Sequence, residues 1–122
     1  MKPLYFVGTS RDDLSAFPEE VKDSTGYALY LAQLGDKHPR AKPLRGFGGA
    51  GVLEAVANDD GDTYRTVYAI RLPSAVYVLH AFQKKPTRGI TTPQREIALV
   101  RERLRLAEAH HSIAFRQERG IR

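Results

Sequence analysis

The chain has 122 residues, which is room for one domain of ordinary size. Hydrophobic residues make up 42% of it, enough for a core and too many for a disordered chain. It contains no cysteine, which excludes a disulfide scaffold, a thiol nucleophile and a zinc site with cysteine ligands. No apolar run approaches the roughly 20 residues that span a bilayer, and the start does not continue into a signal peptide. We therefore expect one small cytoplasmic domain, 1–122, without membrane contact.

The net charge of +5 is concentrated in the last third of the chain. Residues 1–83 contain nine Lys/Arg and ten Asp/Glu, whereas residues 84–122 contain ten Lys/Arg and four Asp/Glu. A clustered positive field indicates a polyanionic partner such as nucleic acid, or an acidic protein. A solvated basic helix that serves only solubility explains the composition equally well.

The first third of the sequence predicts one strand and two helices. A β-rich run over 4–8 is typical of a first strand. Residues 11–16 predict a short helix with an acidic first turn, capped by Ser10. A second helix is expected to begin at Pro18 and to stop at Gly35, because apolar residues recur at helical spacing between them.

The middle of the chain predicts a loop followed by three strands. Residues 36–51 are rich in Pro and Gly and form the loop. Strands are expected over 52–57, 63–72 and 75–83, with turn-forming residues between them. Consecutive strands with short turns form an antiparallel meander.

The last third predicts a basic loop, 84–92, and a final helix that opens at Pro93 with Thr92 as its cap. The stretch 111–122 has little pattern and is expected to be a flexible tail. The order β-α-α-β-β-β-α predicts an α+β fold with helices on one face of an antiparallel sheet. The other face would then be open, concave and basic.

Arg65 is the first candidate functional residue. Strand alternation places it with Val67 and Ala69, opposite the more apolar set that includes Tyr64 and Tyr68. The apolar set should face the helices, which leaves Arg65 on the open face. A guanidinium there could bind a phosphate or stabilise charge in a phosphorane-like transition state. The strand pattern alone favours a simpler interpretation, a surface arginine paired with a neighbouring carboxylate.

Lysine and histidine side chains supply further candidates. Lys84 and Lys85 follow the last strand, with Arg88 just beyond, and could hold a scissile phosphate and its neighbour, although most such pairs are merely solvated. His80 could serve as a general base or acid, although a histidine in an apolar strand is more often a hydrogen-bonded core residue. The imidazoles at 110–111 point about 100° apart on a helix, so no metal site is expected there.

Five short motifs occur in the order and at the spacing typical of one family. They are Lys42-Pro43-Leu44-Arg45-Gly46-Phe47-Gly48-Gly49, Leu53-Glu54, Tyr64-Arg65-Thr66-Val67-Tyr68, Leu79-His80-Ala81-Phe82-Gln83-Lys84-Lys85, and Thr92-Pro93 with Glu96-Ile97. With them the chain resembles the phage-derived HigB-like branch of the RelE/ParE toxin superfamily over roughly residues 4–110. Many relatives carry Glu-x-Arg where this chain has Glu54-Ala55-Val56.

The resemblance implies the toxin of a type II toxin–antitoxin module on a RelE-like fold. Relatives of the RelE/HigB type are ribosome-dependent messenger RNA endonucleases that use no metal, and no cofactor is implied. A cognate antitoxin, typically a helix-turn-helix protein in this branch, silences them. The chemistry would be attack of a ribose 2′-hydroxyl on the adjacent phosphate, which needs positioning, charge stabilisation and proton transfer.

The resemblance also implies roles for single residues. The family's central-strand arginine falls on Arg65 and would stabilise the transition state. Its basic residue after the last strand falls on Lys84 or Lys85 and would contact the scissile phosphate. The expected catalytic residues are Arg65, Lys84, Lys85, His80 and Tyr68, and the expected RNA-binding residues are Lys42, Arg45 and Arg88.

Two other functions stay open at this point. A ParE-type toxin that inhibits DNA gyrase by binding would share the fold and need no catalytic set, and the retained Arg65, Lys84 and Lys85 count against it. A regulatory module would keep the fold and the basic face, bind RNA with steep salt dependence and leave transcripts uncut. Because one fold can host all three functions, the site must decide between them.

Overall fold

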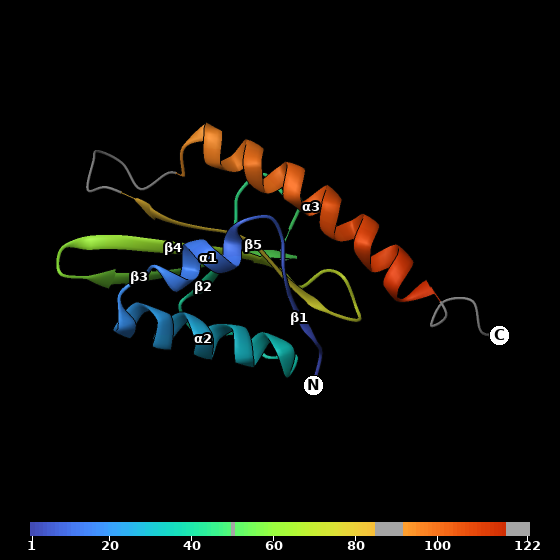
Figure 1. Cartoon of the computed structure of the whole chain (residues 1–122), viewed down its shortest axis with the longest axis horizontal. Coiled ribbons are helices and arrows are strands. Elements are labelled where there is room, and N and C mark those ends of the chain that lie inside the picture. Colours follow the sequence, from blue (N-terminus) through green and yellow to red (C-terminus); the bar gives the residue numbers. More distant parts are fainter. Residues whose placement is uncertain (50, 85–91, 117–122) are drawn as a thin grey trace.

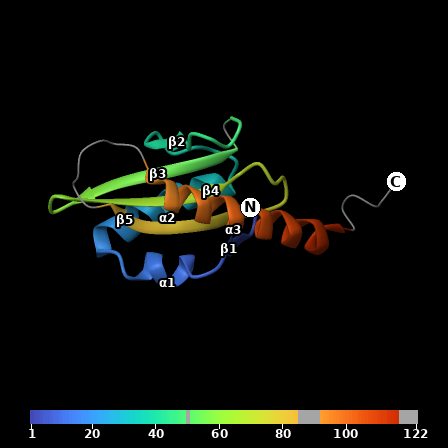
Figure 2. The same cartoon turned by 90° about the horizontal axis from the view of Figure 1, so that it is seen from above.

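A five-stranded mixed sheet with helices on both faces forms the framework of the molecule (Figures 1 and 2). The structure is a computed structural model that describes residues 1–49, 51–84 and 92–116. Its elements in chain order are β1 (Leu4–Phe6), α1 (Ser10–Ser15), α2 (Glu19–Gln33), β2 (Ala41–Pro43), β3 (Val52–Asp59), β4 (Asp62–Ala69), β5 (Val76–Lys84) and α3 (Gln94–Ala114). Among the described residues, no helix is both long and apolar enough to span a membrane. The α+β architecture with an N-terminal strand and a C-terminal helix confirms the predicted fold class.

The strand order is β1-β5-β4-β3-β2, and β3, β4 and β5 form the predicted antiparallel meander. The turn between β3 and β4 places Asp60 (φ 51°) and Gly61 (φ 85°) in the left-handed region, as a tight hairpin turn requires. In contrast to the all-antiparallel prediction, β1 pairs with β5 in parallel. A parallel neighbour needs a long crossover, and the chain between β1 and β5 supplies it.

One edge strand was not predicted. β2 pairs antiparallel with β3, whereas the sequence had indicated a loop over 36–51. The strand is three residues long, includes Pro43 and carries no alternating apolar pattern. Such a segment is extended because its neighbour offers hydrogen-bonding groups, so its own sequence gives little signal.

Each face of the sheet is covered by different helices. On one face, α1 and α2 pack over a core that includes Leu29, Leu53 and Tyr68. On the other, α3 crosses the strands (Figure 2), and Val100 packs there with Val67. The N-terminal helices therefore lie where they were predicted, but the second face is not open. The apolar stripe of α3 needs a core of its own, and this face of the sheet provides it.

The two predicted helix caps have other partners. Ser10 is the first residue of α1, and its Oγ donates a hydrogen bond to the carbonyl oxygen of Val78 at 3.1 Å. Pro93 occupies the position before α3, and the Thr92 hydroxyl binds a carboxylate instead of the helix. In both cases the hydroxyl donates a hydrogen bond to an acceptor distant in the chain instead of capping the helix.

The predicted tail is partly helical. Residues 111–114 belong to α3, which ends at Ala114. His111 is buried there, and its Nε2 accepts a hydrogen bond from the Ser74 backbone N–H at 3.1 Å. Phe115 packs against the core beyond it, with its ring 4.9 Å from that of His111. Burial of His111 and partial burial of Phe115 extend the helix beyond the predicted boundary, whereas 117–122 lie outside the described residues.

A β-bulge in β5 decides which face His80 occupies. Val67 of β4 pairs with His80, and the next residue of β4 pairs with Val78, so Leu79 is an extra residue between them. Strict alternation would place His80 and Val78 together beneath α2. The bulge moves the imidazole to the face of α3, where Arg65 also lies.

Candidate functional site

Arg65 and Glu54 form a buried ion pair between the two central strands. Arg65 Nη1 lies 2.7 Å from Glu54 Oε1, and the two side chains are only 11% and 10% exposed. Arg65 is on the face that alternation predicted, and its partner is a carboxylate. It is not at the surface, because α3 covers this part of the sheet. Glu54 is the one charged residue in the apolar run 52–57, a pattern that signals a buried partner.

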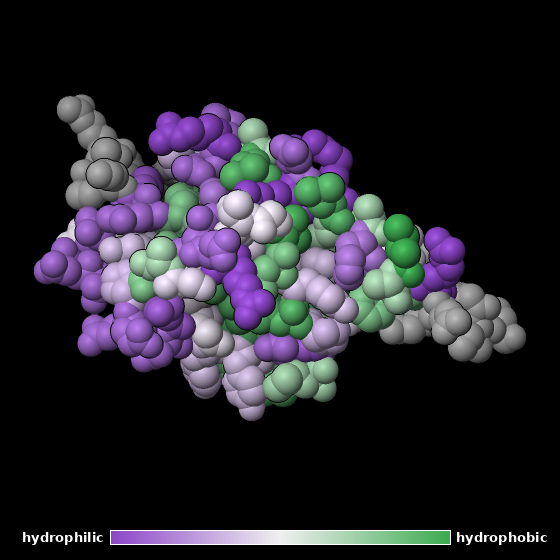
Figure 3. All heavy atoms as spheres, viewed as in Figure 1, coloured by the Kyte–Doolittle hydropathy of each residue, from purple (hydrophilic) through white to green (hydrophobic). Residues whose placement is uncertain are grey.

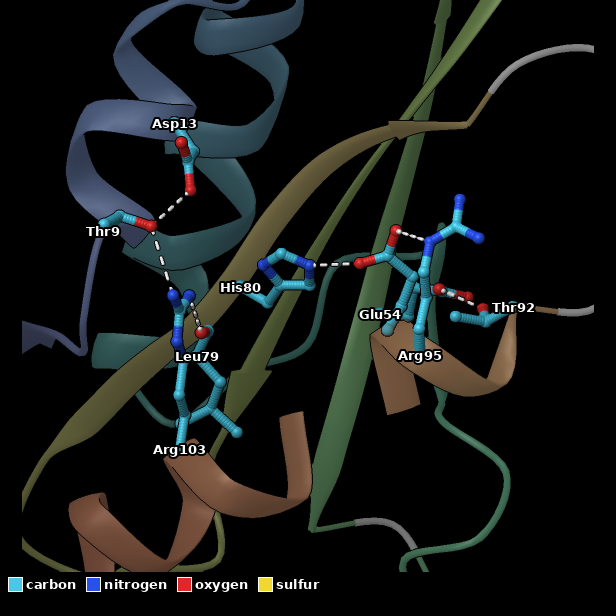
Figure 4. Close-up of polar contacts among 9 residues, drawn as sticks. Thr9, Asp13, Glu54, Leu79, His80, Thr92, Arg95 and Arg103 are labelled. Atoms are coloured by element: carbon cyan, nitrogen blue, oxygen red, sulfur yellow. Dashed lines mark hydrogen bonds and ion pairs between the residues drawn. The ribbon is translucent and has the colours of Figure 1, made fainter. Parts of the chain in front are cut away.

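The second oxygen of Glu54 holds the segment that leads into α3. Thr92 Oγ1 donates a hydrogen bond to Glu54 Oε2 at 3.0 Å (Figure 4). Both side chains are buried. Each carboxylate oxygen thus has one donor here and retains a second lone pair. Glu54 therefore fixes Arg65 and the beginning of α3 relative to each other.

His80 lies against the first turn of α3 (Figure 4). Its Nε2 is 2.7 Å from Glu96 Oε1, and its ring stacks on Phe82 with centroids 4.8 Å apart. Nδ1 is buried and has no hydrogen-bond partner among the described residues. A neutral imidazole that donates its Nε2–H to Glu96 satisfies this geometry, because no buried N–H is then left unpaired. A carboxylate that fixes the tautomer of an imidazole is suited to proton transfer.

A groove of about 330 Å³ opens between β2 and the first turns of α3. Three cationic side chains line it, from Lys42, Arg45 and Arg101, together with the buried Glu54 and Thr92. The β2–β3 register places Lys42 directly opposite Glu54, which puts this lysine on the α3 side of the sheet. Three cations around one already paired carboxylate give the groove a positive potential.

A second hollow is apolar and separate from the groove. Figure 3 shows hydrophobic groups between β1 and α3 among largely hydrophilic surroundings. A cavity of about 250 Å³ lies there, with Tyr5, Tyr77 and Leu106 in its lining. Its lining carries no lysine or arginine, so it lacks the permanent cations that line the groove.

The structure brings some predicted site residues together and separates others. Lys84 ends β5 opposite Thr63, two positions along the strands from the Arg65–Phe82 pair and on the same face. Tyr68 lies on the opposite face beneath α2, where burial raises its pKa to about 12. The predicted Lys85 and Arg88 lie outside the described residues. In the described part of the chain, no group of three or more His, Asp or Glu side chains is arranged to hold a metal ion.

Four polar residues of this region were not predicted as site residues: Glu54, Thr92, Glu96 and Arg101. Glu54 had a signal in the sequence, a lone charge within an apolar strand. Arg101 had none, because α3 carries several arginines and only the packing of the helix shows which one faces the groove.

The mixed sheet, the N-terminal strand and helices and the C-terminal helix are consistent with a RelE-like fold. Residues 12–105 match the family described as Phage derived protein Gp49-like (DUF891), and the chain belongs to this family. The family is known for RelE/HigB-like toxins of toxin–antitoxin modules. No curated protein matches the chain. The matched region contains the groove, the Arg65–Glu54 pair and the His80–Glu96 contact.

Proposed function

We propose that this chain is the toxin of a type II toxin–antitoxin module and that it cuts messenger RNA on the ribosome, in the cytoplasm, without a metal or cofactor. The observation that carries the proposal is one face of the sheet with a cation-lined groove, a buried arginine and an imidazole–carboxylate pair. Membership in the Gp49-like family supports the toxin assignment.

The proposed reaction is a transesterification within the RNA. The ribose 2′-oxygen attacks the adjacent phosphorus and gives its proton to a base. The bond from phosphorus to the 5′-oxygen of the next nucleotide breaks, and that oxygen takes a proton from an acid. The products are a 2′,3′-cyclic phosphate and a 5′-hydroxyl. Charge that develops on the phosphate oxygens requires fixed cations, and we assign this role to Arg65 together with Lys84 or Lys85.

The His80–Glu96 contact is the proposed proton-transfer pair. Its carboxylate end is 19% exposed and its imidazole end is 8% exposed. Glu96 is therefore the end that reaches the substrate, and His80 positions it. Lys42 and Arg45 would hold the RNA backbone in the groove, with Arg88 as a further predicted contact.

A second candidate function rests on one specific observation. Glu54 already holds the Arg65 guanidinium with a 2.7 Å ion pair, which a scaffold that acts only by binding would also use. A ParE-type gyrase inhibitor or an RNA-binding regulatory module on the same fold would need no free transition-state cation.

Mapping of transcript 5′ ends after brief induction distinguishes these functions. Wild type should produce new cuts within coding regions, and Arg65→Ala and Glu96→Gln should not. Arg105→Ala is the matched control, because this arginine of α3 is exposed and is not in the groove lining. Circular dichroism of each variant establishes that loss of cuts is not loss of fold. Growth arrest without cuts would instead favour a binding toxin, and neither effect would favour a regulatory module.

The proposed partner is a helix-turn-helix antitoxin, encoded beside this gene, that covers the basic groove. Its co-expression should restore growth.

A further inference from the structure

Arg101 and Phe47 form a stack at the groove, and the proposed cleavage reaction does not use it. The guanidinium carbon of Arg101 lies 4.7 Å from the centre of the Phe47 ring. Phe47 is only 6% exposed, whereas Arg101 is exposed. The guanidinium therefore lies over the buried ring while the Arg101 residue stays exposed to solvent.

The stack is fixed from the backbone. Arg101 Nη1 donates a hydrogen bond to the Gly46 carbonyl oxygen at 3.3 Å, and Arg71 Nη2 donates one to the Phe47 carbonyl oxygen at 2.6 Å. Gly46 has φ +99°, a conformation that favours glycine. A guanidinium plane held in this way is already ordered before a ligand arrives, which lowers the entropy cost of binding.

The size and lining of the groove restrict what it can bind. A volume of about 330 Å³ is at the small end of the range for ligand sites, so it suits a single unit of a polymer. Lys42 and Arg45 offer charge for a phosphate. Glu54 offers carboxylate lone pairs, which can only accept hydrogen bonds.

From these features we infer that the groove binds one unpaired nucleotide of single-stranded RNA, an inference that rests on the proposed function for the identity of the polymer. The base stacks on the exposed side of the Arg101 guanidinium, since guanidinium planes stack on bases as aromatic rings do. The phosphate lies between Lys42 and Arg45. Glu54 accepts a hydrogen bond from an exocyclic amino group, which cytosine has and uracil lacks.

The test uses the purified full chain and two RNA hexamers, hexacytidine and hexauridine, each with 2′-O-methyl groups that prevent attack by the 2′-oxygen. Fluorescence anisotropy at low salt should show tighter binding of hexacytidine. Arg101→Ala should weaken that binding about tenfold, in the range known for loss of one stacked base. Arg101→Lys should lose nearly as much, because lysine keeps the charge without the plane.

Arg11→Ala is the matched control. Arg11 is also exposed and lies 5.9 Å from the ring of Phe6, but it is on α1, away from the groove. This variant should bind as wild type does. Equal losses in the Arg11 and Arg101 variants, wild-type affinity in Arg101→Ala or Arg101→Lys, or equal affinity for the two hexamers would overturn the inference.

The binding test and the cleavage test fail independently. If hexacytidine binds in an Arg101-dependent way while transcripts remain uncut in cells, the cleavage proposal fails and the nucleotide site stands. If transcripts are cut while Arg101→Ala binds RNA and cuts as wild type does, the nucleotide site fails and the cleavage proposal stands.

Discussion

Arg65 and Glu54 are joined diagonally across two antiparallel strands. The register places Val56, not Glu54, directly opposite Arg65, yet Nη1 and Oε1 lie 2.7 Å apart. An arginine at position 56 would face Arg65 directly. With valine in that place, Glu54 serves Arg65 and Thr92.

Removal of one member of this ion pair should destabilise the protein more than removal of both members. Glu54→Leu and Arg65→Met should each lower the free energy of unfolding by about 3–5 kcal/mol, because each leaves an uncompensated buried charge. The double variant should lose much less than the sum of the two. Urea unfolding of all four proteins measures the coupling energy. Strictly additive losses would contradict an energetically coupled pair.

Stability should fall at alkaline pH because of two buried tyrosines. Burial raises the pKa of Tyr68 to about 12, and burial together with Tyr5 raises that of Tyr77 to about 12, from the ordinary value of 10. Below pH 10 both groups are neutral in both states, so they cause no pH dependence. Between pH 10 and 12 the unfolded chain loses protons that the folded chain keeps, so stability falls by about 1.4 kcal/mol per pH unit for each group. Urea unfolding across this range, with tyrosinate absorbance, measures the slope, and a flat profile would contradict it.

Tyr68→Phe should show that the Tyr68 hydroxyl takes no part in the cleavage reaction. The Tyr68 hydroxyl is fully buried and has no hydrogen-bond partner in the part of the chain that the structure describes. Its removal should leave stability at neutral pH equal or higher and should make the alkaline slope shallower. Transcript cuts should persist, because Tyr68 lies on the opposite face of the sheet from Arg65. Loss of cuts in a folded Tyr68→Phe protein would restore Tyr68 as a candidate for proton transfer.

Two glycine substitutions should act in opposite directions. Gly8 has φ +60°, and a Cβ there would lie 2.7 Å from Nε of Arg103, whose guanidinium binds the Leu79 carbonyl oxygen and the Thr9 hydroxyl (Figure 4). Gly8→Ala should therefore destabilise the protein by about 1–3 kcal/mol. Gly26, within α2, has open space around it, so Gly26→Ala should stabilise by about 1 kcal/mol. Thermal unfolding of both variants tests this, and shifts of the same sign would contradict it.

The groove cations should contribute to RNA affinity without base preference. Lys42→Ala and Arg45→Ala should weaken binding of hexacytidine and hexauridine equally, and each should reduce the slope of log affinity against log salt by about 0.7. Lys37→Ala is the control, because this exposed lysine is not in the groove lining. A loss of slope in the Lys37 variant as large as in the groove variants would indicate diffuse charge instead of a site.

Local sequence was enough where local physics decides the structure. The helix up to Gly35, the turn at Asp60-Gly61 and the apolar face of the last helix follow from propensity, backbone freedom and periodicity. The motifs around Arg65 indicated a phage-derived toxin family, and the chain belongs to the Gp49-like family. Arg65 also lies on the predicted face of β4, because side chains alternate regularly between the two faces along this strand.

Long-range contacts decided the remainder. The bulge at Leu79 that turns His80 toward α3, the capture of the Thr92 hydroxyl by Glu54, and the choice of Arg101 among the arginines of its helix all depend on partners distant in the chain. The sequence by itself determined the strands other than β2, the helices apart from the last turn of α3, and which residues carry charge. Only the tertiary structure decided which charges face one another, because a side chain's burial and its hydrogen-bond partner are fixed when separate elements pack.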